Sequence, residues 1–193
     1  MKLYKQVLID SLIGDEDKVE YVMNVAAGIV MKIDEDNRKQ ILLIQRASDD
    51  HWPLHWEFPR GKCDKPIGES LIKCAQREIK EETALDVEVL TLIDTFEYMA
   101  DQGKRKSICH NFLCRMKDPN QKIKLSKEHQ YYKWISELGE AELLVMPDQK
   151  KSIEKVLNTD RPIASQPDNE FTKNNQIEEY LQWLQKKTLT RLQ

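Results

Sequence analysis

Three glutamates, Glu78, Glu81 and Glu82, are the residues of this chain whose type and spacing point most directly to chemistry. They stand at positions i, i+3 and i+4, so on a helix their carboxylates project from one face. Like charges this close repel one another unless a cation lies between them. Clustered carboxylate oxygens are hard ligands of the kind that Mg²⁺ or Mn²⁺ prefers. The spacing therefore predicts a divalent-metal site that acts on phosphates.

The segment that must position these carboxylates is a loop followed by a helix. Residues 70–83 contain no glycine or proline, whereas both punctuate residues 61–68, which is the pattern of a loop that leads into a helix. Leu71, Ala75 and Ile79 recur every fourth residue and form an apolar stripe. One side of the helix is therefore expected to pack on a core, beside the side that presents the carboxylates.

The composition is that of a globular domain. The chain has 193 residues, of which 40% are hydrophobic and 33% charged, and its formal net charge is -3. This length allows one domain with modest extensions, and the slight excess of negative charge argues against a protein that coats nucleic acid. Apolar runs such as residues 41–44 are too short to span a membrane, and no signal peptide is expected at the N-terminus.

The four cysteines bear on the compartment. Cys63, Cys74, Cys109 and Cys114 include no Cys-x-x-Cys pair. Free thiols in a reducing compartment are the favoured interpretation, ahead of a zinc site or a disulfide. Cys109 and Cys114 are expected on opposite faces of one strand. A cytoplasmic protein is therefore expected.

The order of apolar segments, turns and helical patterns predicts an α/β fold with a mixed sheet. Three parts are expected: an N-terminal extension at 1–16, one domain at 17–157, and a linker with a C-terminal amphipathic helix at 158–193. The strand and helix signals predict hairpins at 19–46 and 86–116, a short strand at 131–135, and helices at 138–145 and 147–157.

The acidic segment resembles a family signature. Its spacing, Glu69-x7-Arg77-Glu78-Ile79-x-Glu81-Glu82, is similar to the core of the Nudix box, whose full pattern is Gly-x5-Glu-x7-Arg-Glu-U-x-Glu-Glu-x-Gly-U, with U aliphatic. There are two departures: seven residues, rather than five, separate Gly61 from Glu69, and Ala84 replaces a glycine. Extra loop length costs little. Ala84 is expected to be tolerated as long as the backbone there is not left-handed.

This resemblance implies a Nudix-type α/β/α sandwich with a mixed β-sheet and the hydrolysis of a diphosphate linked to another group. It implies Mg²⁺ or Mn²⁺ as the cofactor. By position in the box, Glu78, Glu81, Glu82 and the carbonyl of Gly61 resemble the metal ligands.

Further roles follow from the same resemblance. Arg77 resembles the family arginine that pairs with a box glutamate and orients it, and Glu69 resembles that partner. A glutamate beyond the box often serves as a metal ligand or base in this family, and Glu128 is the candidate here. On chemical grounds, we hypothesise that Glu128 or Glu82 is the base that takes a proton from the attacking water.

Two segments outside the box resemble different branches of the family. Leu125-Ser-Lys-Glu-His129, followed by Trp134, is similar to asymmetric diadenosine tetraphosphate hydrolases. Trp56-Glu-Phe-Pro-Arg-Gly-Lys-Cys-Asp-Lys65 is similar to mRNA-decapping enzymes. The favoured substrate is a dinucleoside polyphosphate such as diadenosine tetraphosphate, with capped RNA as the alternative. Damaged nucleoside triphosphates and diphosphoinositol phosphates stay open, as does a catalytically silent Nudix-fold subunit of a larger complex.

Residues around the box are candidates for substrate contacts. Arg60, Lys62 and Lys65 flank it with positive charge and are expected to bind phosphates. Trp56 lies in a loop expected at 47–61 and is a candidate for stacking on a nucleobase, with plain packing as the alternative. Tyr132 is a further candidate substrate contact.

Overall fold

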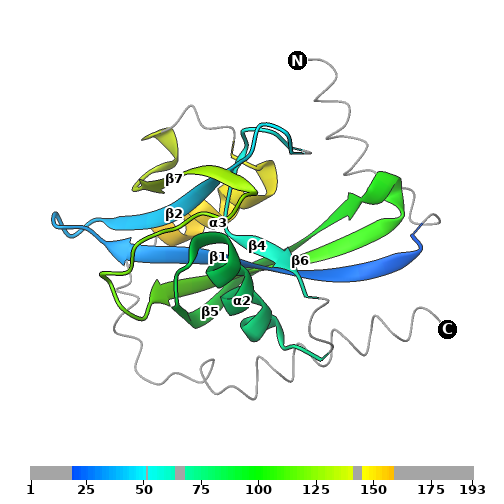
Figure 1. Ribbon diagram of the computed structural model, residues 1–193, viewed down its shortest axis with the longest axis horizontal. Coiled ribbons are helices and arrows are strands. Elements are labelled where there is room, and N and C mark those ends of the chain that lie inside the picture. Colours follow the sequence, from blue (N-terminus) through cyan, green and yellow to red (C-terminus); the bar gives the residue numbers. More distant parts are fainter. Residues whose placement is uncertain (1–18, 51, 64–67, 141–144, 159–193) are drawn as a thin grey trace.

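A mixed β-sheet with a helix on each face positions the residues of interest (Figure 1). The computed structural model describes residues 19–50, 52–63, 68–140 and 145–158, so the expected N-terminal extension, Lys65 and the expected C-terminal helix lie outside the described residues. The elements are β1 (Tyr21–Ile33), β2 (Lys39–Arg46), β3 (Trp56–Glu57), β4 (Arg60–Lys62), α2 (Leu71–Thr83), β5 (Val87–Ala100), η2 (Asp101–Gly103), β6 (Arg105–Met116), β7 (His129–Ile135), η3 (Leu138–Glu140) and α3 (Pro147–Leu157).

Strand β1 lies in the middle of the sheet. It runs parallel to β6 and antiparallel to β2 and β4. β5 pairs antiparallel with β6, and β2 pairs antiparallel with β3 and β7. The two predicted hairpins are confirmed, as are the strand predicted at 131–135 and the helix predicted at 147–157.

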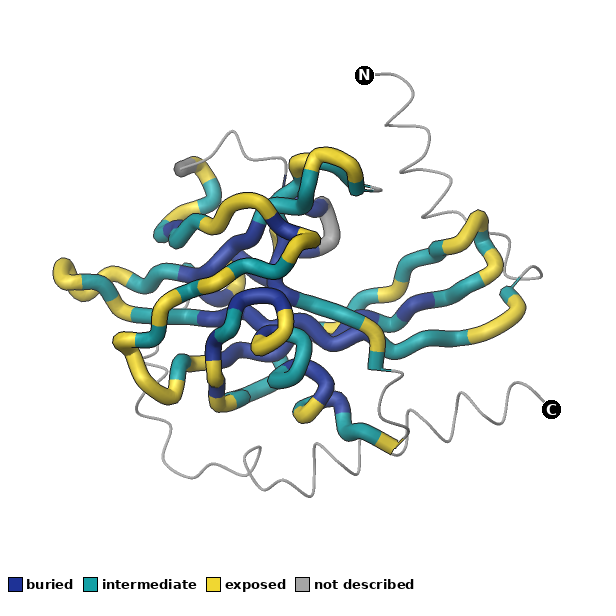
Figure 2. The backbone as a smooth tube through the Cα atoms, in the orientation of Figure 1, coloured by how far each residue is buried: buried dark blue, intermediate teal, exposed yellow. Residues whose placement is uncertain are grey.

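Both faces of the sheet are buried, as Figure 2 shows for its central part. Ala26 and Val30 of β1 belong to the hydrophobic cluster that packs against α2. Ala27 and Ile29 of the same strand belong to the cluster that packs against α3. This alternation follows from the two-residue period of a strand, and it places α2 and α3 on opposite faces. The predicted α/β/α sandwich is therefore confirmed.

Helix α2 packs directly on β1 through its apolar stripe. Leu71, Ala75 and Ile79 are all buried, as the spacing predicted. A Cβ atom at Gly28 of β1 would overlap the Ile79 side chain, so glycine at this position lets the helix approach the sheet closely. This contact holds the carboxylates of α2 at a fixed height above the sheet.

Some element boundaries differ from those predicted. The loop expected at 47–61 contains the short strands β3 and β4, because its backbone pairs with distant residues of β2 and β1. Of the helix predicted at 138–145, the first three residues form a 3-10 turn, η3, and the last, Val145, forms a parallel bridge with Trp56, while residues 141–144 lie outside the described residues. Long-range backbone pairing of this kind depends on tertiary context rather than on local propensity.

The C-terminal end of α2 corrects one expectation. Ala84 follows the helix with φ 62° and ψ 9°, in the left-handed region, and its N–H donates to the carbonyl of Lys80 at 2.9 Å. The condition under which alanine was expected to be tolerated here, a backbone that is not left-handed, is therefore not met. The physical reason is that a left-handed residue satisfies a free carbonyl at the end of the helix.

Replacing Ala84 by glycine should stabilise the protein. A Cβ in the left-handed region costs about 1–2 kcal/mol, and the greater freedom of glycine in the unfolded chain takes back roughly half of that. We expect the free energy of unfolding in urea to rise by about 0.5–1 kcal/mol. The matched control is Ala75→Gly inside the same helix, which should lower it by about 1 kcal/mol. Equal losses at both positions would contradict this explanation.

Among the helices of the described residues, none combines the length and apolar character needed to cross a membrane.

Candidate active site

The three carboxylates of α2 lie in different environments. The side chains of Glu78 and Glu82 are largely buried, whereas that of Glu81 is 58% exposed. The backbone N–H of Arg60 in β4 donates to Glu82 Oε2 at 3.0 Å. The helix therefore directs Glu78 and Glu82 toward β4 and leaves Glu81 at the rim.

Gly61 lies against the carboxyl group of Glu78. β4 pairs with β1, with Gly61 opposite Ala26. A Cβ atom at Gly61 would overlap all three atoms of the Glu78 carboxyl group. Only glycine allows the backbone of β4 to approach this carboxylate so closely. The structure thus brings Gly61 against Glu78 and places Glu82 at the neighbouring residue of β4, Arg60; the metal-binding role that the resemblance implies for them stays a prediction.

Arg77 joins the loop and the helix. Its guanidinium donates to Glu69 at 2.9 and 3.1 Å, to Glu78 at 2.6 Å and to Glu81 at 3.2 Å, and Nη2 also donates to the carbonyl of Lys62 at 3.1 Å. The ion pair expected between Arg77 and Glu69 is therefore present. The hydrogen bond with Glu69, and after it the hydrogen bond with Glu78, raise the pKa of Arg77 against the opposing effect of burial.

Glu57 is a charged centre that the sequence analysis missed. Its side chain is 1% exposed. It accepts hydrogen bonds from Arg46 and from Arg60 Nε, the latter at 2.9 Å, and His129 Nε2 lies 3.6 Å away. Burial alone would raise the pKa of Glu57, but Arg60, His129 and Arg46 outweigh it and lower the pKa to about 2. The available signal was an acidic residue between two aromatic residues, with arginines at 46 and 60.

Glu82 experiences the opposite balance. Burial, and then the negative charges of Glu57, Glu78 and Glu128, raise its pKa well above the usual value, and the hydrogen bond from Arg60 only partly offsets this. A buried carboxylate under this repulsion gains most from an added cation. The position of Glu82 therefore favours cation binding.

These residues fit a divalent metal ion in chemistry. Among the described residues, no three His, Cys, Asp or Glu side chains are already arranged so that they could hold a metal ion together. However, the close approach of Gly61 to Glu78 and the repulsion acting on Glu82 bring together hard oxygen donors of the kind that Mg²⁺ and Mn²⁺ prefer. His129 Nε2 adds a buried nitrogen without a hydrogen-bond partner among the described residues.

The other predicted site residues lie around this centre. Glu128 is exposed, and its charge acts on Glu82. The side chain of Arg60 is largely buried against Glu57, with its guanidinium 5.8 Å from the ring of Tyr98. Lys62 is exposed and contacts Arg77 through its carbonyl.

The two aromatic candidates differ in what they contact. Trp56 packs against the cluster beneath α3, which matches the packing alternative. Tyr132 is 48% exposed and lies opposite Ile44 of β2. Tyr132 therefore presents more open aromatic surface than Trp56.

The cysteine expectation is corrected in part. Cys63, which follows β4, forms a disulfide with Cys74 of α2, whereas Cys109 and Cys114 are thiols buried in opposite clusters. The interpretation of four free thiols is wrong for the first pair, because the packing of α2 beside β4 brings their Cα atoms to 5.5 Å, within the range for a disulfide. The disulfide fixes the segment after Gly61 to the helix one turn before Arg77.

Reducing this disulfide should destabilise the protein. The bond joins residues 11 positions apart, and closing a loop of that size in the unfolded chain contributes about 3 kcal/mol in the chain-entropy model. We expect the free energy of unfolding to fall by up to this amount when dithiothreitol is added. The double variant Cys63→Ser, Cys74→Ser is the control and should not respond to the reductant. A response of similar size in the double variant would point to another cause.

Comparison with known proteins places this geometry in context. The family model described as NUDIX domain matches residues 23–156. The chain is 33% identical to an asymmetrical bis(5′-nucleosyl)-tetraphosphatase of Mus musculus over 120 residues, which are 60% of this chain and 77% of that protein. It is 30% identical to a dihydroneopterin triphosphate diphosphatase of Escherichia coli (strain K12) over 139 residues, 66% of this chain and 89% of that protein.

Two solved structures resemble this chain in fold. The crystal structure of a C. elegans Ap4A hydrolase binary complex superimposes with a TM-score of 0.57 and 28% sequence identity, over 69% of this chain and 94% of that one. A MutT NUDIX hydrolase from Burkholderia pseudomallei shares the fold with a TM-score of 0.58 at 19% identity, over 71% of this chain and 99% of that one. The fold that surrounds the carboxylates is thus shared with an Ap4A hydrolase and with a MutT NUDIX hydrolase.

Proposed function

The chain belongs to the Nudix hydrolase family, enzymes that act on acid anhydrides in phosphorus-containing compounds, and on that premise we propose that it cleaves dinucleoside polyphosphates such as diadenosine tetraphosphate. The relatives at 33% and 28% identity that are described as tetraphosphatase and Ap4A hydrolase support this choice. So does the segment Leu125–His129, which resembles that branch.

The observation that carries the proposal is the approach of β4 to two carboxylates of α2, with Gly61 against Glu78 and the N–H of Arg60 bonded to Glu82. With Glu81 at the rim, Gly61, Glu78 and Glu82 would hold Mg²⁺ or Mn²⁺. When bound, such an ion neutralises phosphate charge and acidifies a water molecule.

The chain's own residues complete the reaction. Glu128 or Glu82 takes a proton from the water that attacks phosphorus, and the P–O bond to the departing nucleotide breaks. Arg77 holds Glu69, Glu78 and Glu81 in position. Lys62 and Lys65 supply positive charge for the remaining phosphates, and Arg60, whose guanidinium is paired with Glu57, donates its backbone N–H to Glu82.

A substrate-panel assay tests this proposal. The panel contains diadenosine tetraphosphate, capped RNA, 8-oxo-dGTP and dihydroneopterin triphosphate, each with Mg²⁺ or Mn²⁺, and the products are identified by chromatography. We expect AMP and ATP from diadenosine tetraphosphate at the highest kcat/KM. Faster release of a cap nucleotide would favour decapping, and no hydrolysis of any compound would favour a catalytically silent subunit.

A cytoplasmic location is part of the same proposal. Its support from the cysteines now rests on the thiols of Cys109 and Cys114, because Cys63 and Cys74 are bonded to each other.

A further inference from the structure

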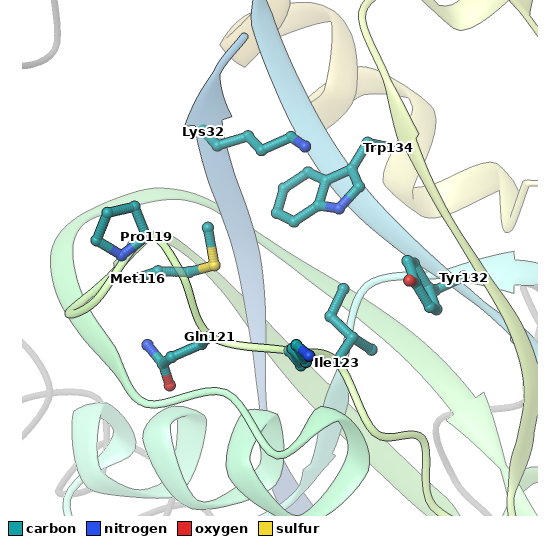
Figure 3. A pocket seen from close by; sticks show the side chains of 8 residues that line it. Lys32, Met116, Pro119, Gln121, Ile123, Tyr132 and Trp134 are labelled. Atoms are coloured by element: carbon teal, nitrogen blue, oxygen red, sulfur yellow. The ribbon is translucent and has the colours of Figure 1, made fainter.

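A pocket of about 360 Å³ lies beside the candidate active site, between β1, β7 and the segment that follows β6 (Figure 3). Its volume falls in the range of small-molecule sites. We propose that this pocket holds the second nucleoside of a dinucleoside polyphosphate whose phosphate chain lies at the carboxylates. This inference rests on the proposed function. It assigns a place to the nucleoside at the far end of the phosphate chain.

The pocket adjoins the carboxylates through the segment that forms one of its walls. Ile123 lines the pocket. The next residues run beside the end of α2, where the N–H of Lys124 donates to the carbonyl of Thr83 at 2.9 Å and the N–H of Ser126 donates to the carbonyl of Glu82 at 3.0 Å. This wall therefore continues directly to Glu82.

The pairing of the strands shows independently how Tyr132 of the pocket lies relative to Glu57, the buried carboxylate beside the candidate active site. Ile44 of β2 pairs with Glu57 of β3 on one side and with Tyr132 of β7 on the other. Paired residues in neighbouring strands point to the same face. Because strands lie roughly 4.8 Å apart, Glu57 and Tyr132 stand about 10 Å from each other. Since the charge of Glu57 acts on Glu82, Tyr132 lies on the same face of the sheet as the carboxylate centre and about two strand spacings from Glu57.

The lining of the pocket suits a nucleoside with adjacent phosphates. Tyr132 presents a half-exposed ring, and Lys32 Nζ lies 4.4 Å from the ring centre of Trp134. Lys122 adds a second ammonium group at the wall. Within the described part of the chain, no acidic residue lines the pocket. Aromatic rings stack on nucleobases, and ammonium groups attract phosphates.

Two substrates that differ only in the second nucleoside test the inference. Diadenosine tetraphosphate and adenosine 5′-tetraphosphate carry the same phosphate chain, and only the first has a nucleoside for this pocket. For Tyr132→Ser we expect KM for diadenosine tetraphosphate to rise about tenfold, since stacking on one ring has that order of effect. For adenosine 5′-tetraphosphate we expect kcat/KM to stay within about twofold.

Tyr131→Ser is the matched control. Tyr131 precedes Tyr132 in β7 and is 64% exposed. Since successive side chains of a strand point to opposite faces, Tyr131 lies away from the pocket, and the variant should keep the wild-type KM for both substrates. Lys122→Gln provides a second, exposed variant, for which we expect a rise of about threefold for diadenosine tetraphosphate only. Equal changes for the two substrates in Tyr132→Ser, or none, would overturn the inference. A wild-type protein that cleaves neither compound would instead refute the proposed function.

Discussion

Glu82→Gln should lower kcat/KM for diadenosine tetraphosphate by about 10²–10⁴-fold, which is the range expected when a side chain that transfers a proton in the reaction is lost. The same substitution should leave the free energy of unfolding unchanged or raise it. Burial and the charges of Glu57, Glu78 and Glu128 raise the pKa of Glu82, so its ionised form is unfavourable in the folded protein. Glutamine keeps an oxygen that can accept the hydrogen bond from Arg60.

This opposition between activity and stability distinguishes a functional carboxylate from a structural one. The control is Glu97→Gln, because Glu97 is an exposed carboxylate of β5 paired with Lys106, and we expect both quantities to stay near the wild-type values. Hydrolysis rates and urea unfolding curves at pH 7 provide the two measurements. Full activity in Glu82→Gln would remove Glu82 from the proposed mechanism, and a large loss of stability would contradict the electrostatic argument.

Glu57→Gln should have the largest effect on stability. Glu57 is buried with Arg46 and Arg60, and removing one charge from a buried network leaves its partners uncompensated. We expect the free energy of unfolding to fall by about 3–5 kcal/mol. The matched control is Glu88→Gln on the exposed pair with Arg115, for which a change below about 1 kcal/mol is expected.

The pH dependence of stability provides a second measurement on the same residue. The pKa of Glu57 is lowered to about 2 in the folded protein, from its usual value of 4.5. The unfolded state therefore binds more protons between these values, so the contribution of Glu57 is complete above pH 4.5 and is lost as the pH falls toward 2. This contribution amounts to about 3 kcal/mol. Glu57→Gln should lack this part of the acid dependence, and an unchanged acid profile would contradict the assignment.

Local patterns in the sequence were sufficient to predict the helix of the site. The four-residue spacing of Leu71, Ala75 and Ile79 predicted both its buried stripe and the side that carries the carboxylates, because a helix has a fixed period. The pair of Arg77 and Glu69 was expected from the family resemblance. The roles assigned to all these residues stay predictions until variants are measured.

Other features depend on contacts that local sequence does not encode. Glu57 became a buried centre because β2, β4 and β7 bring Arg46, Arg60 and His129 around it. The disulfide arises from the placement of β4 beside α2. In both cases residues far apart in the sequence meet through strand pairing or helix packing, and spacing along the chain gives no measure of such meetings.

The contacts of Arg77 bear on the order in which folding and loading take place. Its guanidinium pairs with Glu69, Glu78 and Glu81, so one positive charge of the chain itself already holds these three carboxylates near one another. We therefore expect the protein to fold without a bound ion and to stay folded in the presence of a chelator. Arg77 would then act as a partial internal counter-ion that leaves the remaining negative charge of the carboxylates for a cation.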